Sequence, residues 1–390
     1  MVNHIHAIVA ICLTAIYLIS STWALKCERN AWPADEHHFV KERVVNLDLP
    51  PEERWEEIMK EHKFLFIELV NKMKSQIREV FHVNEGFFEM LEIFIPDHVK
   101  DNLAEEYWLE MEGIAKSSNL HISYIITTNI LYEIAALCTT ATQYDESIDD
   151  IVQLRNLDFG IMMGWDHINN RWIIQEYLQP LLMSVNFTSS GKTLFRSVGY
   201  AGSIGVLTGM KPSGFAISIN LRFSINGGYL GLMELFFNII NNQSFATLAV
   251  RDVLTNVNTY EAAVANLSHT PLISSVYFTI SGVRPHEGCV LARSRTRLVD
   301  RWEIQSLSQN IRDKLLVQTN YDRNKPQPIT DNRVYPVYRC VVESPKNQSI
   351  IAKLYNALST NPVGDIITIH TTIMCARNNI FKSYLRNFTL

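Results

Sequence analysis

Apolar residues recur at steps of three and four through the first third of the chain, a spacing typical of amphipathic helices. The longest such pattern covers residues 50–81, where charged residues mostly occupy the other face. Asp48 and the Pro50–Pro51 pair before it are typical of a helix start. Further helical patterns cover residues 87–94, 103–115 and 122–137. The last of these is almost wholly apolar, so it predicts a buried helix that leads into Cys138.

The pattern changes after Cys138 to short β-branched runs that are separated by turns. These runs predict strands over residues 139–143, 151–159, 172–177, 182–187, 193–198, 215–220, 276–281, 289–293 and 315–319. Helical patterns interrupt them at residues 231–240, 245–254 and 259–267. Helices followed by strands and then by mixed elements indicate an α+β fold. Because no linker separates these parts, we expect a single domain.

The amino-terminal 24 residues predict a signal peptide. An apolar run over residues 7–20 is followed by small residues at Thr22 and Ala24, which suit cleavage after Ala24. The run is shorter than the 20 or so residues of a membrane span, although a signal anchor is the alternative. Sequons for N-glycosylation then occur at Asn186, Asn242, Asn266, Asn347 and Asn387. Together these features indicate a glycosylated protein of the secretory pathway.

Composition and charge exclude several classes of protein. Hydrophobic residues make up 47% of the chain and charged residues 19%, which excludes intrinsic disorder. A net charge of −5 gives no electrostatic reason to expect nucleic-acid binding. No metal-ligand spacing accompanies His37–His38, so we expect neither a metal nor another cofactor. Of six cysteines, Cys12 leaves with the signal peptide, and the odd remainder implies a free or intermolecular thiol.

A polar stretch at residues 145–150 predicts the turn of a β-hairpin. Antiparallel pairing about its centre places Cys138 opposite Leu157 or Asp158. The thiol then lies within a few Å of Arg155 and Asp158. Because these two are three residues apart, a flat strand puts them on opposite faces. Both can serve one site if the strand bends or ends there.

This group of residues fits nucleophilic catalysis. A cation such as Arg155 lowers the pKa of a neighbouring thiol. A backbone amine can act as the base if the chain is cut so that Cys138 becomes an amino terminus. A plainer interpretation also fits, in which Cys138 is an inert buried side chain and Arg155 pairs with Asp158.

A collinear series of motifs covers nearly all of the mature chain. They are VNLDLPPEERW (45–55), LYEIAALCTT (131–140), RNLDFGIMMGW (155–165), RFSINGGYLG (222–231), HEGCV (286–290), VQTNYDR (317–323) and DNR (331–333). In this order they resemble the family of N-terminal nucleophile hydrolases that contains acid ceramidase and N-acylethanolamine-hydrolysing acid amidase. FGIMMGW and RFSINGGYLG favour acid ceramidase, whereas YEAAVANLSHTPLI (260–273) is at least as similar to the amidase.

The resemblance implies a fold, a cut and a reaction. The implied fold is an α-β-β-α sandwich of two antiparallel sheets, preceded by a helical α-subunit. Self-cleavage between Leu137 and Cys138 would give an α-subunit of residues 25–137 and a β-subunit of residues 138–390. The implied activity is hydrolysis of ceramide to sphingosine and fatty acid, in the lysosome or after secretion, with N-acylethanolamines as the alternative substrate. A membrane surface or a lipid-presenting activator protein would deliver the lipid.

The resemblance also implies a role for each matching residue. Cys138 supplies the thiol and, once freed, the α-amine, which Asp158 holds. Arg155 places positive charge near the thiol and the amide oxygen. Asn320 stabilises the oxyanion, and Arg333 is the second active-site arginine. At acidic pH an ordinary amine is protonated, so either burial lowers its pKa or a thiolate–ammonium pair is the ground state.

The remaining cysteines and some departures from the family complete this picture. By resemblance, Cys27 and Cys340 form a disulfide between the subunits, and Cys289 is a buried free thiol; Cys375 has no assigned role. The family has a glutamate where this chain has Leu221 and a glycine where it has Leu154, and the hairpin turn is one residue longer. The missing glutamate motivates an alternative of another class, a catalytically inactive secreted lipid-binding protein.

Overall fold

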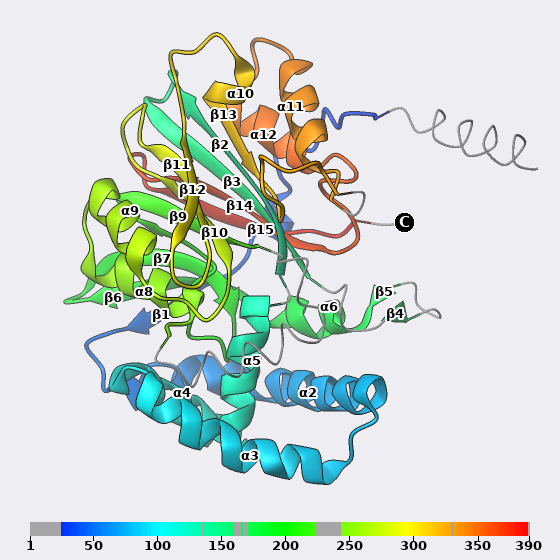
Figure 1. Ribbon diagram of the computed structural model, residues 1–390, viewed down its shortest axis with the longest axis vertical. Coiled ribbons are helices and arrows are strands. Elements are labelled where there is room, and N and C mark those ends of the chain that lie inside the picture. Colours follow the sequence, from blue (N-terminus) through cyan, green and yellow to red (C-terminus); the bar gives the residue numbers. More distant parts are fainter. Residues whose placement is uncertain are drawn as a thin grey trace, which may run out of the picture.

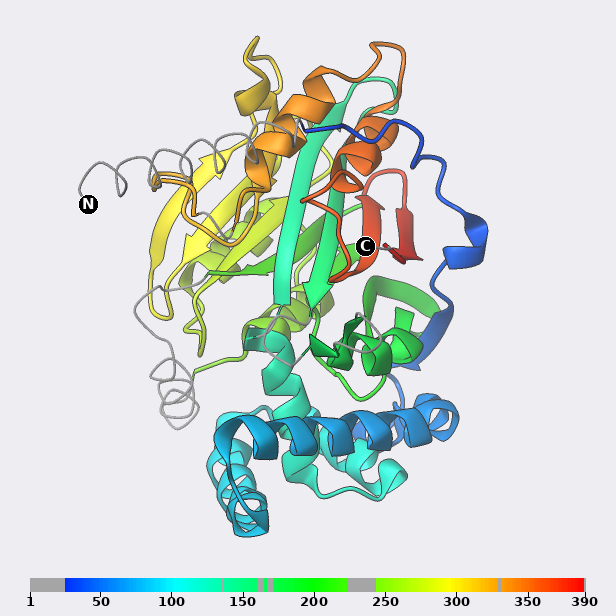
Figure 2. The same cartoon turned by 90° about the vertical axis from the view of Figure 1, so that its right-hand side faces the viewer.

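The computed structural model describes residues 25–134, 136–159, 165–166, 171–222, 243–328 and 331–388. The predicted signal peptide, the predicted helix over residues 231–240 and the sequon at Asn242 lie outside these residues. A layer of helices forms one end of the molecule, and a sandwich of two sheets forms the other (Figures 1 and 2). No helix in the described part of the chain is long and apolar enough to cross a membrane.

The helices agree with most of the predicted positions. They are α2 (Glu56–Phe81), α3 (Glu85–Val99), α4 (Glu105–Ser118), α5 (Ile122–Ile134), α6 (Ile173–Leu178), α8 (Ala246–Asn256), α9 (Tyr260–His269), α10 (Ile311–Lys314), α11 (Val334–Val342) and α12 (Ile350–Leu358). In the described residues they are accompanied by the 3₁₀ turns η1 (Glu36–His38), η2 (Pro51–Glu53), η3 (Lys100–Asn102) and η4 (Gln179–Leu181). Acidic residues in the first turns of α2 and α4 complement the helix dipole, and α4 ends at Asn119 in the left-handed conformation.

Two large sheets face each other in the sandwich. The eight-stranded sheet has the order β1 (Glu42–Asn46), β6 (Leu182–Ser189), β7 (Lys192–Tyr200), β8 (Thr208–Lys211), β9 (Phe215–Leu221), β10 (Val276–Ser281), β11 (Gly288–Arg293) and β12 (Leu298–Glu303). The five-stranded sheet has the order β13 (Leu315–Gln318), β2 (Ala136–Asp145), β3 (Asp150–Phe159), β14 (Thr368–Cys375) and β15 (Ile380–Leu385). Two short strands, β4 (Trp165–Asp166) and β5 (Arg171–Trp172), pair separately.

Helices cover both outer faces of this sandwich. Helices α8 and α9 lie on the larger sheet, while α11 and α12 lie on the smaller one (Figure 1). The α+β class and the α-β-β-α arrangement are therefore confirmed. One detail differs, because β1 pairs with β6 in parallel, so the larger sheet is not wholly antiparallel. This strand also shows that the segment expected to be helical contributes an edge strand to the sandwich.

The β2–β3 hairpin has one of the two predicted registers. Cys138 lies opposite Leu157, and the pairing closes on Asp145 and Asp150. In the turn, Asp145 Oδ1 accepts hydrogen bonds from the backbone and the hydroxyl of Ser147, at 3.0 and 2.6 Å. Such Asp-centred turns pre-form the reversal of the chain, which explains why local sequence located it.

Two boundary predictions are wrong. The segment predicted as a strand over residues 172–177 is mostly helix α6, which lies beside α2 with Leu178 buried. Packing against the helical layer outweighs the β-branched pair at its start. The buried helix also ends at Ile134, and β2 begins at Ala136, so Cys138 lies inside a strand. Pairing with β3 holds residues 136–138 in an extended conformation, so they do not continue the helix.

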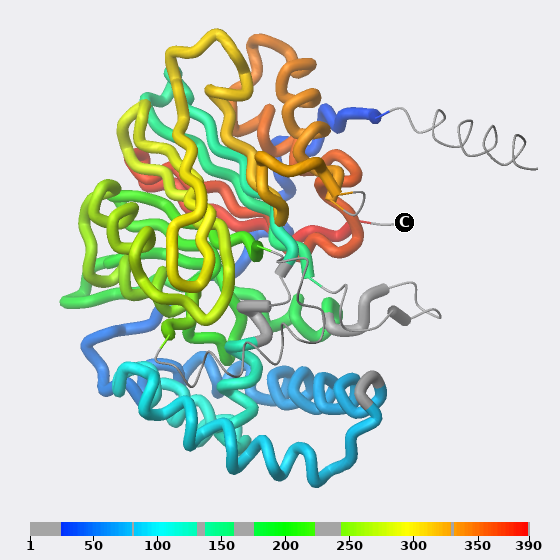
Figure 3. The backbone as a smooth tube through the Cα atoms, in the orientation of Figure 1, coloured from blue at the N-terminus to red at the C-terminus, as the bar shows by residue number. Residues whose placement is uncertain are grey.

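The carboxyl-terminal segment supplies a central strand that the sequence reading did not predict. Strand β14 lies between β3 and β15, with Thr372 opposite Arg155. Figure 3 shows this segment, in red, beside the hairpin of β2 and β3 although the two are far apart in the sequence. The end of the chain therefore completes the sheet that carries Cys138.

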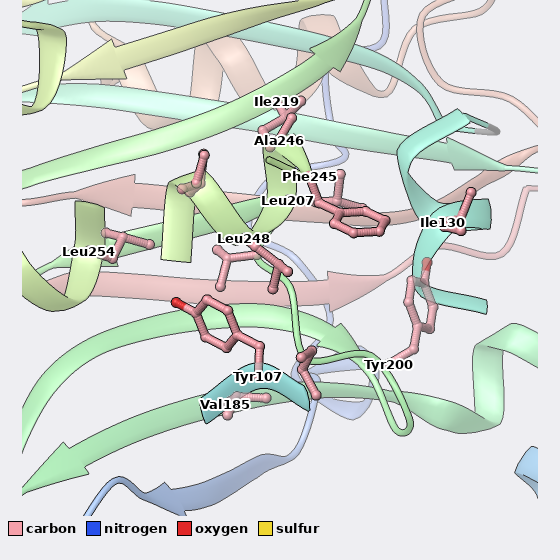
Figure 4. Packing of buried hydrophobic residues seen from close by; sticks show 14 of the residues in the cluster. Tyr107, Ile130, Val185, Tyr200, Leu207, Ile219, Phe245, Ala246, Leu248 and Leu254 are labelled. Carbon is pink, nitrogen blue, oxygen red and sulfur yellow. The ribbon is translucent and has the colours of Figure 1, made fainter. Parts of the chain in front are cut away.

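One apolar core continues from the helical layer into the sandwich. Helix α5 runs from that layer to the start of β2 (Figure 2). Figure 4 shows part of the core, with Tyr107 of α4, Ile130 of α5, Val185 of β6 and Leu248 of α8. Gly202, with φ +90°, leaves room for the Phe66 ring of α2. Close packing thus fixes the helical layer against the sheet.

Candidate active site

Cys138 and Arg155 meet on the inner face of the smaller sheet. Because Thr140 pairs with Arg155 and Cys138 with Leu157, the two side chains lie diagonally on one face. Arg155 Nη2 donates to Cys138 Sγ at 2.7 Å. Both residues are fully buried. The cation predicted beside the thiol is therefore in contact with it.

Arg155 is held by the opposite sheet. Its Nη2 donates to the carbonyl of Ile219 at 2.8 Å, and its Nη1 donates to the carbonyl of Leu207 at 3.3 Å. Nη1 also donates to the Thr208 hydroxyl. Neutral carbonyls fix the guanidinium without neutralising it, so its charge remains directed at the sulfur.

Asp158 lies on the other face of β3, and Arg333 connects the two faces. Asp158 accepts hydrogen bonds from Arg333 Nη1 at 2.9 Å and from the Thr368 hydroxyl at 2.7 Å. The same Arg333 nitrogen donates to the backbone carbonyl of Cys138 at 3.2 Å. β3 ends one residue after Asp158. The site thus contacts Cys138 from both faces of the sheet. Arg155 binds its side chain on one face, and Arg333 binds its backbone carbonyl from the other.

Asn320 reaches the same backbone from the loop after β13. Its Oδ1 accepts from the Cys138 N–H at 3.0 Å and from Arg333 Nη2 at 2.8 Å. Its Nδ2 donates to the carbonyl of Leu221 at 2.7 Å. Asp331 accepts from the Asn320 N–H and from Arg333 Nε, both at 2.9 Å. The structure therefore brings all five predicted catalytic residues into one buried cluster.

Burial sets the protonation of this cluster. Burial raises the pKa of the Cys138 thiol, although Arg155 opposes the shift. Burial also raises the pKa of Asp158 to about 7, against the lowering effect of Arg333. Burial disfavours the charged form of Arg333, but Asp331 and Asp158 outweigh it and raise the pKa of the guanidinium. In this continuous chain the thiol is neutral at acidic and neutral pH.

Sequence reasoning missed two side chains of the cluster. Asp331 belongs to the DNR motif, in which the resemblance gives a role to Arg333 alone. Asn220 accepts from the Thr140 hydroxyl at 2.9 Å and donates to the Cys138 carbonyl at 3.3 Å. As a polar residue that alternates with apolar ones in a strand, Asn220 looks solvent-facing in the sequence. It is fully buried because a second sheet covers that face.

The two residues that replace side chains of the resembled family have different surroundings. Leu154 is fully buried in β3, opposite Ala141 and Ile373, so it fills the core behind the hairpin. Leu221 ends β9 half-buried, and its carbonyl accepts the bond from Asn320 described above. The backbone at this position therefore contributes to the site whatever its side chain is.

The other cysteines and the sequons lie outside this cluster. A disulfide joins Cys27 to Cys340, with Cα atoms 5.4 Å apart, while Cys289 and Cys375 are buried free thiols. Of the sequon asparagines, those that are exposed are Asn266, Asn347 and Asn387. Asn186 is half-buried in β6. Within the described residues, no group of three or more His, Cys, Asp or Glu side chains is arranged to hold a metal ion.

Comparisons with known proteins place the chain in a family. A model of the beta subunit of N-acylethanolamine-hydrolysing acid amidase matches residues 40–99, and one of linear amide C–N hydrolases of the choloylglycine hydrolase family matches residues 138–312. The chain is 34% identical to the acid ceramidase of Mus musculus over 368 residues, 94% of this chain and 92% of that protein. The chain belongs to the acid ceramidase family. The acid ceramidase of Homo sapiens is 32% identical over 368 residues, with 94% and 91% covered.

A solved structure agrees with this assignment. The N-acylethanolamine-hydrolysing acid amidase ortholog of Caenorhabditis elegans matches with a TM-score of 0.54 and 26% identity, covering 64% of this chain and 100% of that chain. The resemblance carried by the motifs is thus confirmed. As a member of the acid ceramidase family that also matches the linear amide C–N hydrolases, the chain is an amidohydrolase.

Proposed function

We propose that this chain is a self-processing amidase that hydrolyses the amide bond of ceramide to sphingosine and fatty acid. The observation that carries the proposal is the buried contact of Cys138 with Arg155 and Asn320, at the residue where the match to linear amide hydrolases begins. Identity to acid ceramidases over nearly the whole chain supports ceramide as the substrate.

Self-processing breaks the bond between Leu137 and Cys138. The thiol attacks the Leu137 carbonyl carbon, and its proton passes to the Cys138 nitrogen as the C–N bond breaks. One water then hydrolyses the thioester, which leaves a carboxylate on Leu137 and a free α-amine on Cys138. The products are an α-subunit of residues 25–137 and a β-subunit of residues 138–390. The start of the matched region at residue 138 supports this division.

Each catalytic residue then has a place in ceramide hydrolysis. The Cys138 thiol attacks the amide carbonyl, and its α-amine carries the proton to the departing sphingosine nitrogen. Asp158 lies opposite Leu137 in the hairpin, so removal of Leu137 leaves it facing the new amine. Arg155 stabilises the thiolate, and Arg333 holds the Cys138 carbonyl. Water then releases the fatty acid from the thioester.

Asn320 has a donor for the oxyanion. In the continuous chain its Nδ2 donates one N–H to the carbonyl of Leu221. The same NH₂ group carries a second N–H, which can donate to the substrate oxygen while the bond to Leu221 stays in place. A single oxyanion donor of this kind contributes about 3–4 kcal/mol to transition-state stabilisation.

An exposed apolar surface supports delivery of the lipid from a membrane. Met90 and Ile93 of α3 are 51% and 71% exposed, and Phe64 of α2 is 75% exposed. Met90, Ile93 and Phe94 follow helical spacing, so they share one face of α3. We propose that this face contacts a membrane surface or a lipid-presenting activator protein.

The proposed compartment is the lysosome or the extracellular space. A disulfide persists in oxidising compartments, which supports this location for a chain that joins Cys27 to Cys340. We propose N-glycosylation at Asn186, Asn242, Asn266, Asn347 and Asn387. Exposure supports the last three of these directly.

Replacing Cys138 tests the proposal. The full chain, Cys138→Ala and a control Cys289→Ala are expressed through the secretory pathway, and the amino termini are mapped by mass spectrometry. We expect the parent and Cys289→Ala to expose Cys138 as an amino terminus and to hydrolyse ceramide. Cys138→Ala should show neither, because it lacks the nucleophile. Turnover that survives in Cys138→Ala would overturn this mechanism.

Substrate comparison separates the alternatives. Ceramide and an N-acylethanolamine are offered to the processed chain at acidic and at neutral pH. Faster turnover of ceramide supports the proposal, and faster turnover of the N-acylethanolamine supports the amidase alternative. An uncut parent chain without activity toward either lipid supports a binding protein.

A further inference from the structure

Two motifs of the sequence meet at residues to which the reaction assigns no role. Arg222 begins RFSINGGYLG, and Asp322 ends the TNYD part of VQTNYDR. In the fold, Arg222 Nε and Nη2 donate to the two oxygens of Asp322 at 2.6 and 2.9 Å. This two-point pairing fixes both position and orientation, which a single contact does not.

Other donors complete the surroundings of Asp322. The Tyr277 hydroxyl donates to Asp322 Oδ1 at 2.6 Å, and Lys325 Nζ lies 3.1 Å from Oδ2. The side chains of Arg222 and Asp322 are 17% and 14% exposed, so solvent screens the pair weakly. Both oxygens of the carboxylate therefore have donors, from Tyr277 of β10, from Arg222 of the first motif and from Lys325, two residues beyond the second motif.

The ion pair is directly connected to the active site. Leu221, next to Arg222, accepts the hydrogen bond from Asn320 Nδ2 at 2.7 Å. Asn320 lies two residues before Asp322, and its Oδ1 accepts from the Cys138 N–H. Residues 221–222 and 320–322 are therefore joined twice, once by the Asn320–Leu221 hydrogen bond and once by the Arg222–Asp322 ion pair. These two links close a ring of contacts. Such a ring sets the direction in which the Asn320 amide points.

We propose that Arg222 and Asp322 are positioning residues that orient Asn320 toward the reacting carbonyl. The inference rests on the proposed function, in which Asn320 stabilises the oxyanion. The ion pair and the Asn320–Leu221 bond together hold the loop of Asn320 against β9, so the second N–H of the amide keeps its direction toward the substrate oxygen. The Arg222 guanidinium holds the pKa of Asp322 well below its usual range, which keeps the pair ionised in acidic surroundings.

Asp322→Asn tests this role, with Asp300→Asn as the matched control. Asp300 pairs with Arg323 of the same motif at 3.4 Å, but the two side chains are 32% and 52% exposed, and the pair does not adjoin Asn320. Ceramide turnover is measured on the processed full chain, and kcat is expressed per titrated Cys138 thiol. We expect Asp322→Asn to lower kcat about 100-fold with KM within about twofold, because misplacement by about 1 Å costs that much. Asp300→Asn should retain the parent values.

Several outcomes overturn the inference. It fails if Asp322→Asn lowers the melting temperature while kcat per thiol is unchanged, since the pair would then only stabilise the fold. It also fails if both variants lose activity equally. If Asp322→Asn is not secreted, kcat and KM are measured for Arg222→Lys instead. Lysine keeps the positive charge but loses the two-point pairing with Asp322, so this variant tests the same contact. A parent chain that hydrolyses neither lipid refutes the proposed function itself.

Discussion

The carboxyl groups of Asp158 and Asp322 belong to the same network, yet their pKa values shift in opposite directions. Burial raises the pKa of Asp158 to about 7, whereas Arg222 lowers the pKa of Asp322. Arg333 contacts Asp158 but also serves Asp331 and Asn320, so its charge is shared. Asp322 binds the Arg222 guanidinium through both of its oxygens and is less deeply buried. One acid therefore takes up a proton as the pH falls, and the other stays ionised.

Asp158 predicts a pH dependence of stability. The pKa of Asp158 in the folded chain lies above the unfolded value near 3.9. Its contribution to the free energy of unfolding is therefore complete below about pH 4 and is lost as the pH rises through about 7. In the uncut Cys138→Ala chain, Asp158→Asn should remove this dependence. Urea unfolding at pH 4, 5.5 and 7 should therefore show that the stability of the Asp158→Asn variant increases, relative to that of the chain with Asp158, as the pH rises. A stability difference that stays constant with pH would contradict the prediction.

At the scale of elements, a buried ion pair fastens helix α4 to helix α8. Glu110 accepts from Arg251 Nη1 and Nη2 at 2.6 and 2.5 Å, and from Arg54 Nη1 at 2.8 Å. The Trp55 indole donates to the same carboxylate at 2.7 Å. Arg251 belongs to the proposed β-subunit and the other three residues to the α-subunit. The contact therefore joins parts that become separate chains after the cut.

Glu110→Gln should destabilise the protein by about 3–5 kcal/mol, because it leaves Arg251 buried without its counter-charge. Glu106→Gln is the control, since Glu106 also pairs with Arg54 but its side chain is 51% exposed. That variant should stay within about 1 kcal/mol of the parent. Chemical denaturation of the uncut chain measures both. Equal effects would mean that burial does not set the strength of this contact.

The turn after β7 offers a second test at this scale. A methyl group at Gly202 would meet the Phe66 ring at 2.2 Å, and φ is +90°, a conformation that alanine rarely adopts. Gly202→Ala should therefore destabilise the protein by about 1–3 kcal/mol. Gly199→Ala is the control, because its methyl group would meet nothing within 4 Å. Thermal unfolding of both variants should separate them, and matching melting temperatures would refute the close approach.

At the scale of the whole molecule, the two proposed subunits are linked both covalently and by packing. The disulfide joins Cys27, near the start of the described chain, to Cys340 in α11. The apolar core runs without interruption from the helical layer into the sandwich. We therefore expect a cut before Cys138 to leave the architecture intact.

The disulfide predicts a simple electrophoretic result. The processed protein should run as one band on a denaturing gel without reductant and as two bands with it. Cys340→Ser should give two bands in both cases, because the covalent link is lost, while Cys289→Ala should behave like the parent. A single band for Cys340→Ser without reductant would show that another bond links the subunits.

The sequence by itself determined the elements whose signals are local. Helical periodicity located α2 and α4, and an Asp-rich turn limited the partner of Cys138 to Leu157 or Asp158, of which the structure has Leu157. The order of motifs identified the family and the five residues that are predicted to be catalytic. These features depend on neighbours in the chain, so they are readable without the fold.

The tertiary structure decided the contacts between elements that are distant in the sequence. It placed β14 beside β3, turned residues 173–178 into a helix beside α2, and buried Asn220 between two sheets. It also gave Arg155 its carbonyl partners on β9 and brought Arg222 to Asp322. Each of these contacts joins residues far apart in the chain. Their free energy comes from packing layers together, which no local pattern encodes.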